Sequence, residues 1–380
     1  MKETLESPGG VAGKRKPRIL VSGGGTGGHI FPALSIADEL RGRLDAEILF
    51  VGAENRMEMT RVPEAGYNII GLPVAGFDRK RPWRNIRVLM KLMESMRKAR
   101  KIIKDFKPVV VVGVGGYASG PVLKAAQRAG IPTLIQEQNS YAGVTNKLLA
   151  SNADSICVAY DGMERFFPAD KIKKTGNPIR KRLLSDTLTR KEALESFGLS
   201  ADKKTLLIVG GSLGALTINE SIEKRLKDLV ANGLQVIWQT GKNFGTRGPE
   251  AAKGLKGVVV TPFISDMAAA YKGADLVISR AGAASISELQ ALGKPAILVP
   301  SPNVTEDHQT HNAMALVNKN AGVMVKDSEA REKLVDKALE ILQNPDQLKE
   351  MSENISAMAL PESAKRIGDE VVRLMDMKKG

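Results

Sequence analysis

The stretch that most constrains the fold of this chain is a glycine-rich loop near its start. Residues 21–29 read Val-Ser-Gly-Gly-Gly-Thr-Gly-Gly-His. Residues 18–21 read Arg-Ile-Leu-Val, which predicts a short buried strand, and residues 30–40 carry apolar side chains at helical spacing. The loop therefore joins a strand to a helix N-terminus, where unpaired backbone N–H groups and the helix dipole favour an anion such as a phosphate.

The same pattern returns in the second half of the chain. Residues 205–209 form another apolar run, which leads through Gly210, Gly211 and Gly214 into a helix start. A chain of 380 residues is also longer than one hydrophobic core usually supports. Because alternating strands and helices are typical of parallel α/β architecture, we expect an α/β fold of two Rossmann-like domains whose parallel sheets face each other across a cleft.

Continuous apolar runs are expected to form these sheets, since strands covered by helices on both faces lack an alternating pattern. The runs are residues 19–22, 46–51, 109–113, 133–136, 155–158, 205–209, 235–239, 258–261, 276–279 and 296–299. The expected divisions are a disordered leader at residues 1–17, a first domain at 18–175, a second domain at 176–360 and a charged C-terminal helix at 361–380. The first domain is a candidate docking partner for that last helix.

Composition, cysteine content and net charge limit which kind of protein this chain can be and which partners it can bind. The hydrophobic content of 43% and the charged content of 26% are those of a folded globular protein. The single cysteine, Cys157, excludes an intramolecular disulfide, and its apolar neighbours predict a buried strand position. No apolar run reaches the roughly 18 residues that span a bilayer, so a soluble or peripheral protein is expected. The net charge of +14 predicts an acidic partner, such as nucleic acid, an anionic membrane surface or a phosphorylated substrate.

Much of the positive charge lies between residues 79 and 104. The cations are Arg79, Lys80, Arg81, Arg84, Arg87, Lys91, Arg97, Lys98, Arg100, Lys101 and Lys104, with Glu94 as the one acid among them. Trp83 and further apolar residues recur between them at helical spacing, which predicts a basic amphipathic helix. Such a helix lies on an anionic membrane, where each near-surface cation contributes about 1 kcal/mol. The alternative is an ordinary helix with its apolar stripe in the core.

Three loops of the first half are expected to meet at one edge of the first sheet, because the carboxyl ends of parallel strands border the ligand crevice. They are residues 21–29, 113–121 and 136–140. His29, Glu137 and Asn139 would then line one crevice. His29 has a pKa suited to a general base; Glu137 is either an alternative base or an ordinary loop charge.

The second half offers a candidate nucleotide site. Residues 282–288 follow a predicted strand, and their small side chains allow a helix N-terminus to approach a diphosphate. Glu288 could accept hydrogen bonds from two ribose hydroxyls, and Gln309, with His308 beside it, is a candidate sugar contact. The chain contains neither a D-x-D triplet nor a P-loop motif. No metal site is therefore predicted, and the diphosphate charge is left to backbone N–H groups, helix dipoles and a cation such as Arg180.

Six ordered motifs together resemble those of the MurG-type peptidoglycan glycosyltransferases. They are residues 24–29, 115–121, 137–139, 176–180, 210–212 and 282–288, which include Gly-Gly-Tyr-Ala-Ser-Gly-Pro at 115–121 and Gly-Asn-Pro-Ile-Arg at 176–180. The resemblance runs from about residue 18 to the end of the chain. It implies the GT-B fold, with a membrane-facing acceptor domain followed by a domain that binds UDP-N-acetylglucosamine.

The resemblance also implies an activity and its residues. The activity is inverting transfer of N-acetylglucosamine from UDP-N-acetylglucosamine to the 4-hydroxyl of the muramoyl pentapeptide on undecaprenyl diphosphate, without a cofactor, at the cytoplasmic face of the cell membrane. His29 or Glu137 would act as the base. The implied nucleotide-sugar contacts are Thr26, Gly27, Gly28, Asn139, Arg180, Ser212, Ile264, Ala283, Ala284, Ser285, Ile286, Ser287, Glu288 and Gln309. His308 and Gln309 stand where some relatives have two glutamines, so either side chain of that pair could meet the sugar.

Three other functions compete with this interpretation. A nicotinamide dehydrogenase would share the G-x-G-x-x-G fingerprint of the opening loop and could use Glu54 for the ribose, but it leaves the second glycine loop without a role. A nucleic-acid-binding protein would explain the charge, but the basic segment lacks the aromatic side chains that interleave in single-strand binders; no nucleic acid partner is therefore predicted. Another GT-B glycolipid glycosyltransferase is the nearest rival.

Overall fold

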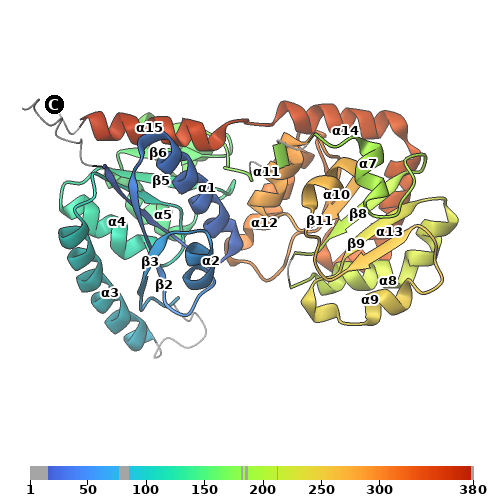
Figure 1. Ribbon diagram of the computed structural model, residues 1–380, viewed down its shortest axis with the longest axis horizontal. Helices are drawn as coiled ribbons and strands as arrows, with labels where there is room; N and C mark the ends of the chain where they lie inside the picture. Colours follow the sequence, from blue (N-terminus) through green and yellow to red (C-terminus); the bar gives the residue numbers. More distant parts are fainter. Residues whose placement is uncertain (1–15, 77–84, 181–182, 185–186, 212, 378–380) are drawn as a thin grey trace, which may run out of the picture.

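The computed structural model of the protein contains two parallel sheets, each covered by helices on both faces (Figure 1). It describes residues 16–76, 85–180, 183–184, 187–211 and 213–377. The strand order is β3-β2-β1-β4-β5-β6-β7 in the first sheet and β10-β9-β8-β11-β12-β13 in the second. In both sheets the order reverses beside the first strand, as in Rossmann folds. The predicted α/β architecture of two Rossmann-like domains is confirmed.

All ten predicted strands are present, close to their predicted bounds. The first sheet contains β1 (Arg18–Ser22), β2 (Glu47–Ala53), β3 (Asn68–Leu72), β4 (Val110–Gly113), β5 (Thr133–Glu137), β6 (Ser155–Val158) and β7 (Ile172–Lys174). The second contains β8 (Thr205–Val209), β9 (Gln235–Gln239), β10 (Val258–Thr261), β11 (Leu276–Ser279), β12 (Ala296–Leu298) and β13 (Val323–Met324). Three strands were not predicted: β3, β7 and β13, which all lie at sheet edges.

The helices divide between the two sheets. Those of the first domain are α1 (Gly27–Leu44), α2 (Glu58–Glu64), α3 (Asn85–Phe106), α4 (Ser119–Arg128) and α5 (Val144–Leu149). Those of the second are α7 (Arg190–Glu195), α8 (Leu216–Ala231), α9 (Arg247–Ala251), α10 (Met267–Gly273), α11 (Ala283–Ala291), α12 (His308–Val317), α13 (Ala330–Gln343) and α14 (Pro345–Ala357). Of the predicted leader, residues 1–15 lie outside the described part of the chain.

Side chains of the central strands point alternately into two apolar layers. In β1, Ile19 and Val21 pack into the layer that contains α1, whereas Leu20 packs on the opposite face with α3 and α4. Cys157 is fully buried in β6, as its neighbours predicted. The two layers hold β1 in the centre of the sheet and so fix the direction in which the glycine loop leaves it.

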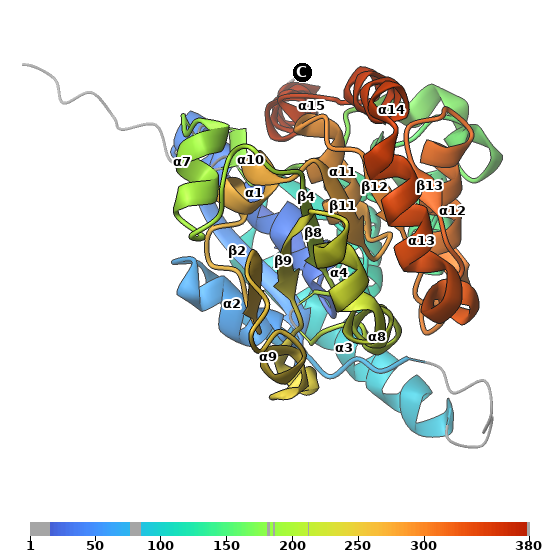
Figure 2. The same ribbon diagram turned by 90° about the vertical axis from the view of Figure 1, so that its right-hand side faces the viewer.

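The chain crosses between the domains twice, and the two crossings touch. Gly176 lies on the first crossing, and a Cβ atom there would be 2.7 Å from the Cβ of Leu360 on the second. After the second crossing, α15 (Ser363–Met377) packs on α1 through residues that include Val371 and Leu374. Figures 1 and 2 both show α14 and α15 running along the same side of the molecule. The last helix thus ties the end of the chain to the first domain.

Candidate active site where the two domains meet

Two glycine loops of the first domain touch backbone to backbone. Gly116 has a φ of +86°, and a Cβ atom there would lie 2.5 Å from the carbonyl oxygen of Gly24. A Cβ atom at Gly23 would lie 2.2 Å from Cγ2 of Val114. Only glycine allows this approach. The predicted convergence of the loops after β1 and β4 is therefore confirmed.

The buried carboxylate of Glu58, the first residue of α2, holds the opening loop in place. It accepts hydrogen bonds from the backbone N–H of Gly25 and of Ala53, both at 2.9 Å. Its side chain also fills the space beside Gly24, where a Cβ atom would lie 2.1 Å from the carboxylate. The sequence carried no signal for this role, because Glu58 belongs to no recognisable motif.

His29 lies in the first turn of α1 and is partly buried. Its Nδ1 is 3.0 Å from the carbonyl oxygen of Gly24 and 3.4 Å from Oγ1 of Thr26. A carbonyl can only accept, which assigns the ring proton to Nδ1 and leaves Nε2 as an acceptor. Nε2 faces Gly115, where a Cβ atom would be 3.0 Å away. Burial lowers the pKa of the imidazole, partly offset by the charge of Glu137, so the ring is a neutral base at neutral pH.

The carboxylate of Glu137, at the end of β5, is almost fully buried and receives four hydrogen bonds. Asn139 donates to Oε1 from its backbone N–H at 3.0 Å and from Nδ2 at 3.2 Å. Gly143 and Asn146 donate to Oε2 at 3.0 and 2.8 Å. A carboxylate offers about four lone-pair positions. Glu137 is therefore fully engaged by its own loop, an arrangement that favours positioning over proton transfer.

Asn312 on α12 joins the two domains at this point. Its Oδ1 accepts from the backbone N–H and the hydroxyl of Ser140 at 2.9 and 3.1 Å. Its Nδ2 donates to Oδ1 of Asn139 at 3.1 Å and to the carbonyl of Ala281 at 3.3 Å. The side chain is completely buried. Asn139 is thus held from both sides, by Glu137 in its own domain and by Asn312 in the other.

A second polar link joins the first crossing to α11. Nδ2 of Asn177 donates to Oγ of Ser287 at 3.1 Å and to the carbonyl of Gln138 at 2.9 Å. Since α1 and α11 are also in contact, the helix that follows the opening glycine loop and the helix that follows Gly282 approach each other at the domain junction. The N-terminal N–H groups of such helices suit an anionic ligand.

The start of α11 has the small side chains predicted for a diphosphate site. Gly282 is its N-cap, Ala284 and Ser285 are half-buried, and Ala283 is buried. These small side chains allow a ligand to approach the N–H groups of the first turn. The side chain of Ile286 faces the core instead, so only its backbone is placed to meet a ligand.

Glu288 is largely buried one turn further along α11. Arg180 donates to its Oε1 from Nε at 3.0 Å and from a terminal nitrogen at 2.9 Å. Tyr271 donates its hydroxyl to Oε2 at 3.2 Å. Burial raises the pKa of Glu288, and the Arg180 guanidinium counteracts that shift. Two predicted contacts, Arg180 and Glu288, are therefore brought together, with acceptor capacity left on Oε2.

The remaining predicted residues are less informative. Gln309 accepts a hydrogen bond from the backbone N–H of Ser301 through Oε1 at 2.8 Å, which engages the oxygen of its amide and not its Nε2 donor. Ile264 is buried in the core of the second domain. Ser212 lies outside the described residues. Across the described part of the chain, no group of three or more His, Cys, Asp or Glu side chains is arranged to hold a metal ion.

Family models match both halves of the chain. Residues 19–158 match the glycosyltransferase family 28 N-terminal domain, and residues 205–367 match the glycosyltransferase family 28 C-terminal domain. The first match covers β1 to β6 of the first sheet, and the second covers all six strands of the second sheet.

Two curated relatives match over almost their whole length. A UDP-N-acetylglucosamine--N-acetylmuramyl-(pentapeptide) pyrophosphoryl-undecaprenol N-acetylglucosamine transferase of Bacteroides thetaiotaomicron is 61% identical over 368 residues, or 96% of this chain and 99% of the relative. The protein of the same name from Bacteroides fragilis is 62% identical over 362 residues, or 94% of this chain and 95% of the relative.

Solved structures give the same family and fold. The crystal structure of Acinetobacter baumannii MurG is 31% identical, has a TM-score of 0.77, and is matched over 94% of this chain and 99% of that one. CalG4, the calicheamicin glycosyltransferase, is 15% identical with a TM-score of 0.71 over 97% of this chain and 100% of that one, which is a likeness of fold alone. The predicted GT-B fold is therefore confirmed, and the chain belongs to the MurG family of glycosyltransferases within family 28.

Proposed function

We propose that the protein transfers N-acetylglucosamine from UDP-N-acetylglucosamine to the 4-hydroxyl of the muramoyl pentapeptide on undecaprenyl diphosphate. The proposal rests on the names of relatives that are more than half identical over nearly the whole chain. The structural observation that carries it is the position of His29. A neutral imidazole with a free Nε2 acceptor lies at the meeting point of two glycine loops, at the N-terminus of a helix that contacts the other domain.

In the proposed reaction, Nε2 of His29 accepts the proton of the acceptor hydroxyl as that oxygen attacks the anomeric carbon. The bond to UDP breaks on the opposite face, so the configuration inverts. The departing diphosphate gains negative charge, which the N–H groups of Gly27 and Gly28 at α1 and the first turn of α11 stabilise. Removal of one such donor from a preorganised anion site typically costs about 10²- to 10³-fold in rate.

The other predicted residues take supporting roles in this proposal. Glu288, held in place by Arg180 and Tyr271, accepts the ribose hydroxyls through the free capacity of Oε2. Asn139 and Gln309 present amide groups to the sugar. Glu137 orients the loop that carries Asn139 and supplies a negative charge that stabilises the imidazolium of His29 during the reaction.

We infer that the first half of α3 lies on an anionic membrane surface. Ile86, Leu89, Met90 and Met93 are between 53% and 68% exposed. In the second half of the helix, by contrast, residues such as Ile102 are buried in the core, so the ordinary-helix alternative describes that half alone. The predicted contributions of Trp83 and of the cations at 79–84 lie outside the described residues.

Bound through this exposed face, the enzyme would be a peripheral protein of the cytoplasmic membrane face, with the active site close to a lipid-linked acceptor. None of the described helices has the length and apolar character needed to cross a bilayer. Arg87 and Lys91 stand between the exposed apolar side chains and would meet anionic headgroups, where each cation contributes about 1 kcal/mol.

A donor panel tests the proposed function. Purified protein is given a muramoyl lipid acceptor and UDP-N-acetylglucosamine, UDP-glucose or UDP-galactose in separate reactions. We expect transfer from UDP-N-acetylglucosamine to exceed the other two by at least about tenfold. Preferential transfer of glucose or galactose would instead indicate the rival function, a different glycolipid glycosyltransferase.

A further inference from the structure

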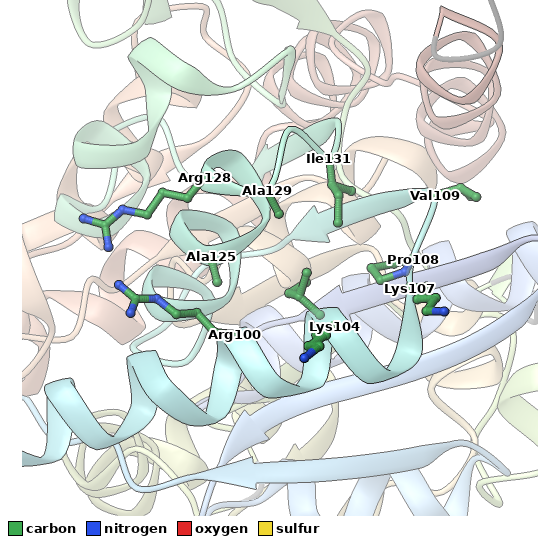
Figure 3. Close-up of a pocket in the computed structure, with 10 residues that line it drawn as sticks. Arg100, Lys104, Lys107, Pro108, Val109, Ala125, Arg128, Ala129 and Ile131 are labelled. Carbon is green, nitrogen blue, oxygen red and sulfur yellow. The ribbon is translucent and has the colours of Figure 1, made fainter.

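An open pocket lies between the C-terminal ends of α3 and α4, away from the domain junction (Figure 3). Its volume is about 620 Å³. Buried apolar residues, among them Ile103 and Ala125, form its floor. Four cations surround it: Arg100 and Lys104 from α3, Lys107 from the turn that follows, and Arg128 from the end of α4.

The four cations have no acidic partner in the described part of the chain. No carboxylate is among the residues that line the pocket, and all four side chains are exposed. Elsewhere on α3 a cation does find a partner, since Lys98 pairs with Glu54 at 3.0 Å. The pocket therefore concentrates positive charge that the protein itself leaves uncompensated.

The negative C-terminal ends of α3 and α4 balance only part of this positive charge. Each helix C-terminus carries roughly half a negative charge, which last-turn cations stabilise. Two helix ends supply roughly one negative charge against the four lining cations, so a surplus of roughly three positive charges remains among the groups that line the pocket, and Asp105 beside Lys104 reduces it from outside the lining. The last carbonyl of α3, on Phe106, already accepts from Arg18 at 3.1 Å.

We infer that this pocket binds a phosphate group, carried either by the headgroup of a membrane lipid or by a soluble phosphate ester. Arginine forks and lysine ammonium groups around one opening suit the several oxygens of a phosphate, and the apolar floor suits a carbon chain or ring attached to it. The inference goes beyond the proposed function: it concerns a separate pocket at the C-terminal end of the basic segment 79–104, to which Arg100 and Lys104 also belong. No residue of this pocket belongs to the proposed active site or to the exposed apolar face of α3.

The first test is a calorimetric titration: inorganic phosphate is added to the protein in a buffer that contains no phosphate, and the heat of binding is measured. The pocket variant is Lys107→Gln/Arg128→Gln. The matched control, Arg97→Gln/Lys101→Gln, removes the same charge from exposed positions of α3 outside the pocket. We expect saturable binding to the unmodified protein, weakened at least about tenfold in the pocket variant and by less than about twofold in the control. Absence of saturable binding, or equal losses in the two variants, would overturn the inference.

The second test distinguishes the two sources of phosphate. Binding is measured to vesicles of phosphatidylcholine with and without phosphatidylglycerol. If the ligand is a headgroup, the pocket variant loses more of the phosphatidylglycerol-dependent binding than the control. Equal losses on vesicles, together with a selective loss of phosphate binding, assign the pocket to a soluble ester. Transfer to a detergent-dispersed acceptor should stay unchanged in both variants, which separates a failure here from a failure of the proposed function.

Discussion

At the scale of single residues, the proposed chemistry depends on His29. The Gly24 carbonyl holds the Nδ1 proton, and burial lowers the pKa of the ring below its usual 6.5. A general base must be unprotonated to act, and a lowered pKa keeps the imidazole neutral to a lower pH. The glycine loop therefore positions His29, and burial keeps its imidazole neutral.

We predict that kcat/KM falls in acid with a midpoint below pH 6.5, because protonation of His29 removes the base. His29→Gln should lower kcat at least about 100-fold and abolish this acid limb. The measurement is a pH–rate profile of both proteins with saturating acceptor. Near-normal turnover of the variant, or an acid limb that persists in it, would show that another group is the base.

The sequence could predict which residues line this site, but not which role each of them has. From the sequence, His29 was the preferred base and Glu137 the alternative, since both follow predicted strands of one sheet. Only the four hydrogen bonds to the Glu137 carboxylate indicate that it holds its loop. Glu58 and Asn312 were missed because their roles arise from contacts between segments far apart in the chain.

At the scale of elements, the two glycine loops act as one unit because Gly116 and Gly24 are in backbone contact. We predict that Gly116→Ala lowers the free energy of unfolding by at least about 2 kcal/mol, since its Cβ meets a carbonyl oxygen and its φ is positive. The matched control is Gly130→Ala, which has a φ of +65° and nothing within 4 Å of the added Cβ. The control should cost about 1 kcal/mol and leave activity intact. Chemical denaturation and transferase assays measure both, and equal behaviour of the two variants would contradict the packing argument.

The helix α3 divides into an exposed half and a buried half, and the exposed half is expected to bind membranes. Leu89→Glu/Met93→Glu should weaken vesicle binding at least about tenfold, because apolar area is lost and negative charge is added. The unfolding free energy should change by less than about 0.5 kcal/mol per site, as at other exposed positions. Leu216→Glu/Phe263→Glu, exposed on the other domain, is the control. Equal vesicle binding of the two variants would argue against a docking face on α3.

Element by element, every strand inside a sheet could be predicted from the sequence, whereas of the four edge strands only β10, with its Val-Val-Val-Thr run, could. Central strands are buried on both faces, so they read as continuous apolar runs. The edge strand β7 has the sequence Ile-Lys-Lys, and β3 contains Asn68 and Gly71, so neither forms such a run. β13 is only two residues long. Short polar edge strands resist pairing with other chains, and the same lack of an apolar run makes them hard to recognise in the sequence.

At the scale of the whole molecule, Asn312 couples the acceptor-side loop to the donor-side loop. We predict that Asn312→Ala lowers kcat/KM at least about tenfold, because Ser140 and Ala281 lose a shared buried partner. Asn318→Ala, at an exposed position just beyond the same helix, should have little effect. A double-mutant cycle with Ser140→Ala should be non-additive, since both side chains serve one contact. Additive losses would mean that Asn312 acts through its own domain alone.

The central claim is that the two domains together catalyse inverting transfer from a nucleotide sugar. Protein groups stabilise the negative charge of the departing diphosphate. The most direct measurement is the reaction of the purified protein with UDP-N-acetylglucosamine and the muramoyl lipid in the presence of a metal chelator, with the anomeric configuration of the product read by NMR. The account predicts a β-linked disaccharide lipid formed at an undiminished rate. An α-linked product, or transfer that is lost in the chelator and restored by added metal, would contradict it.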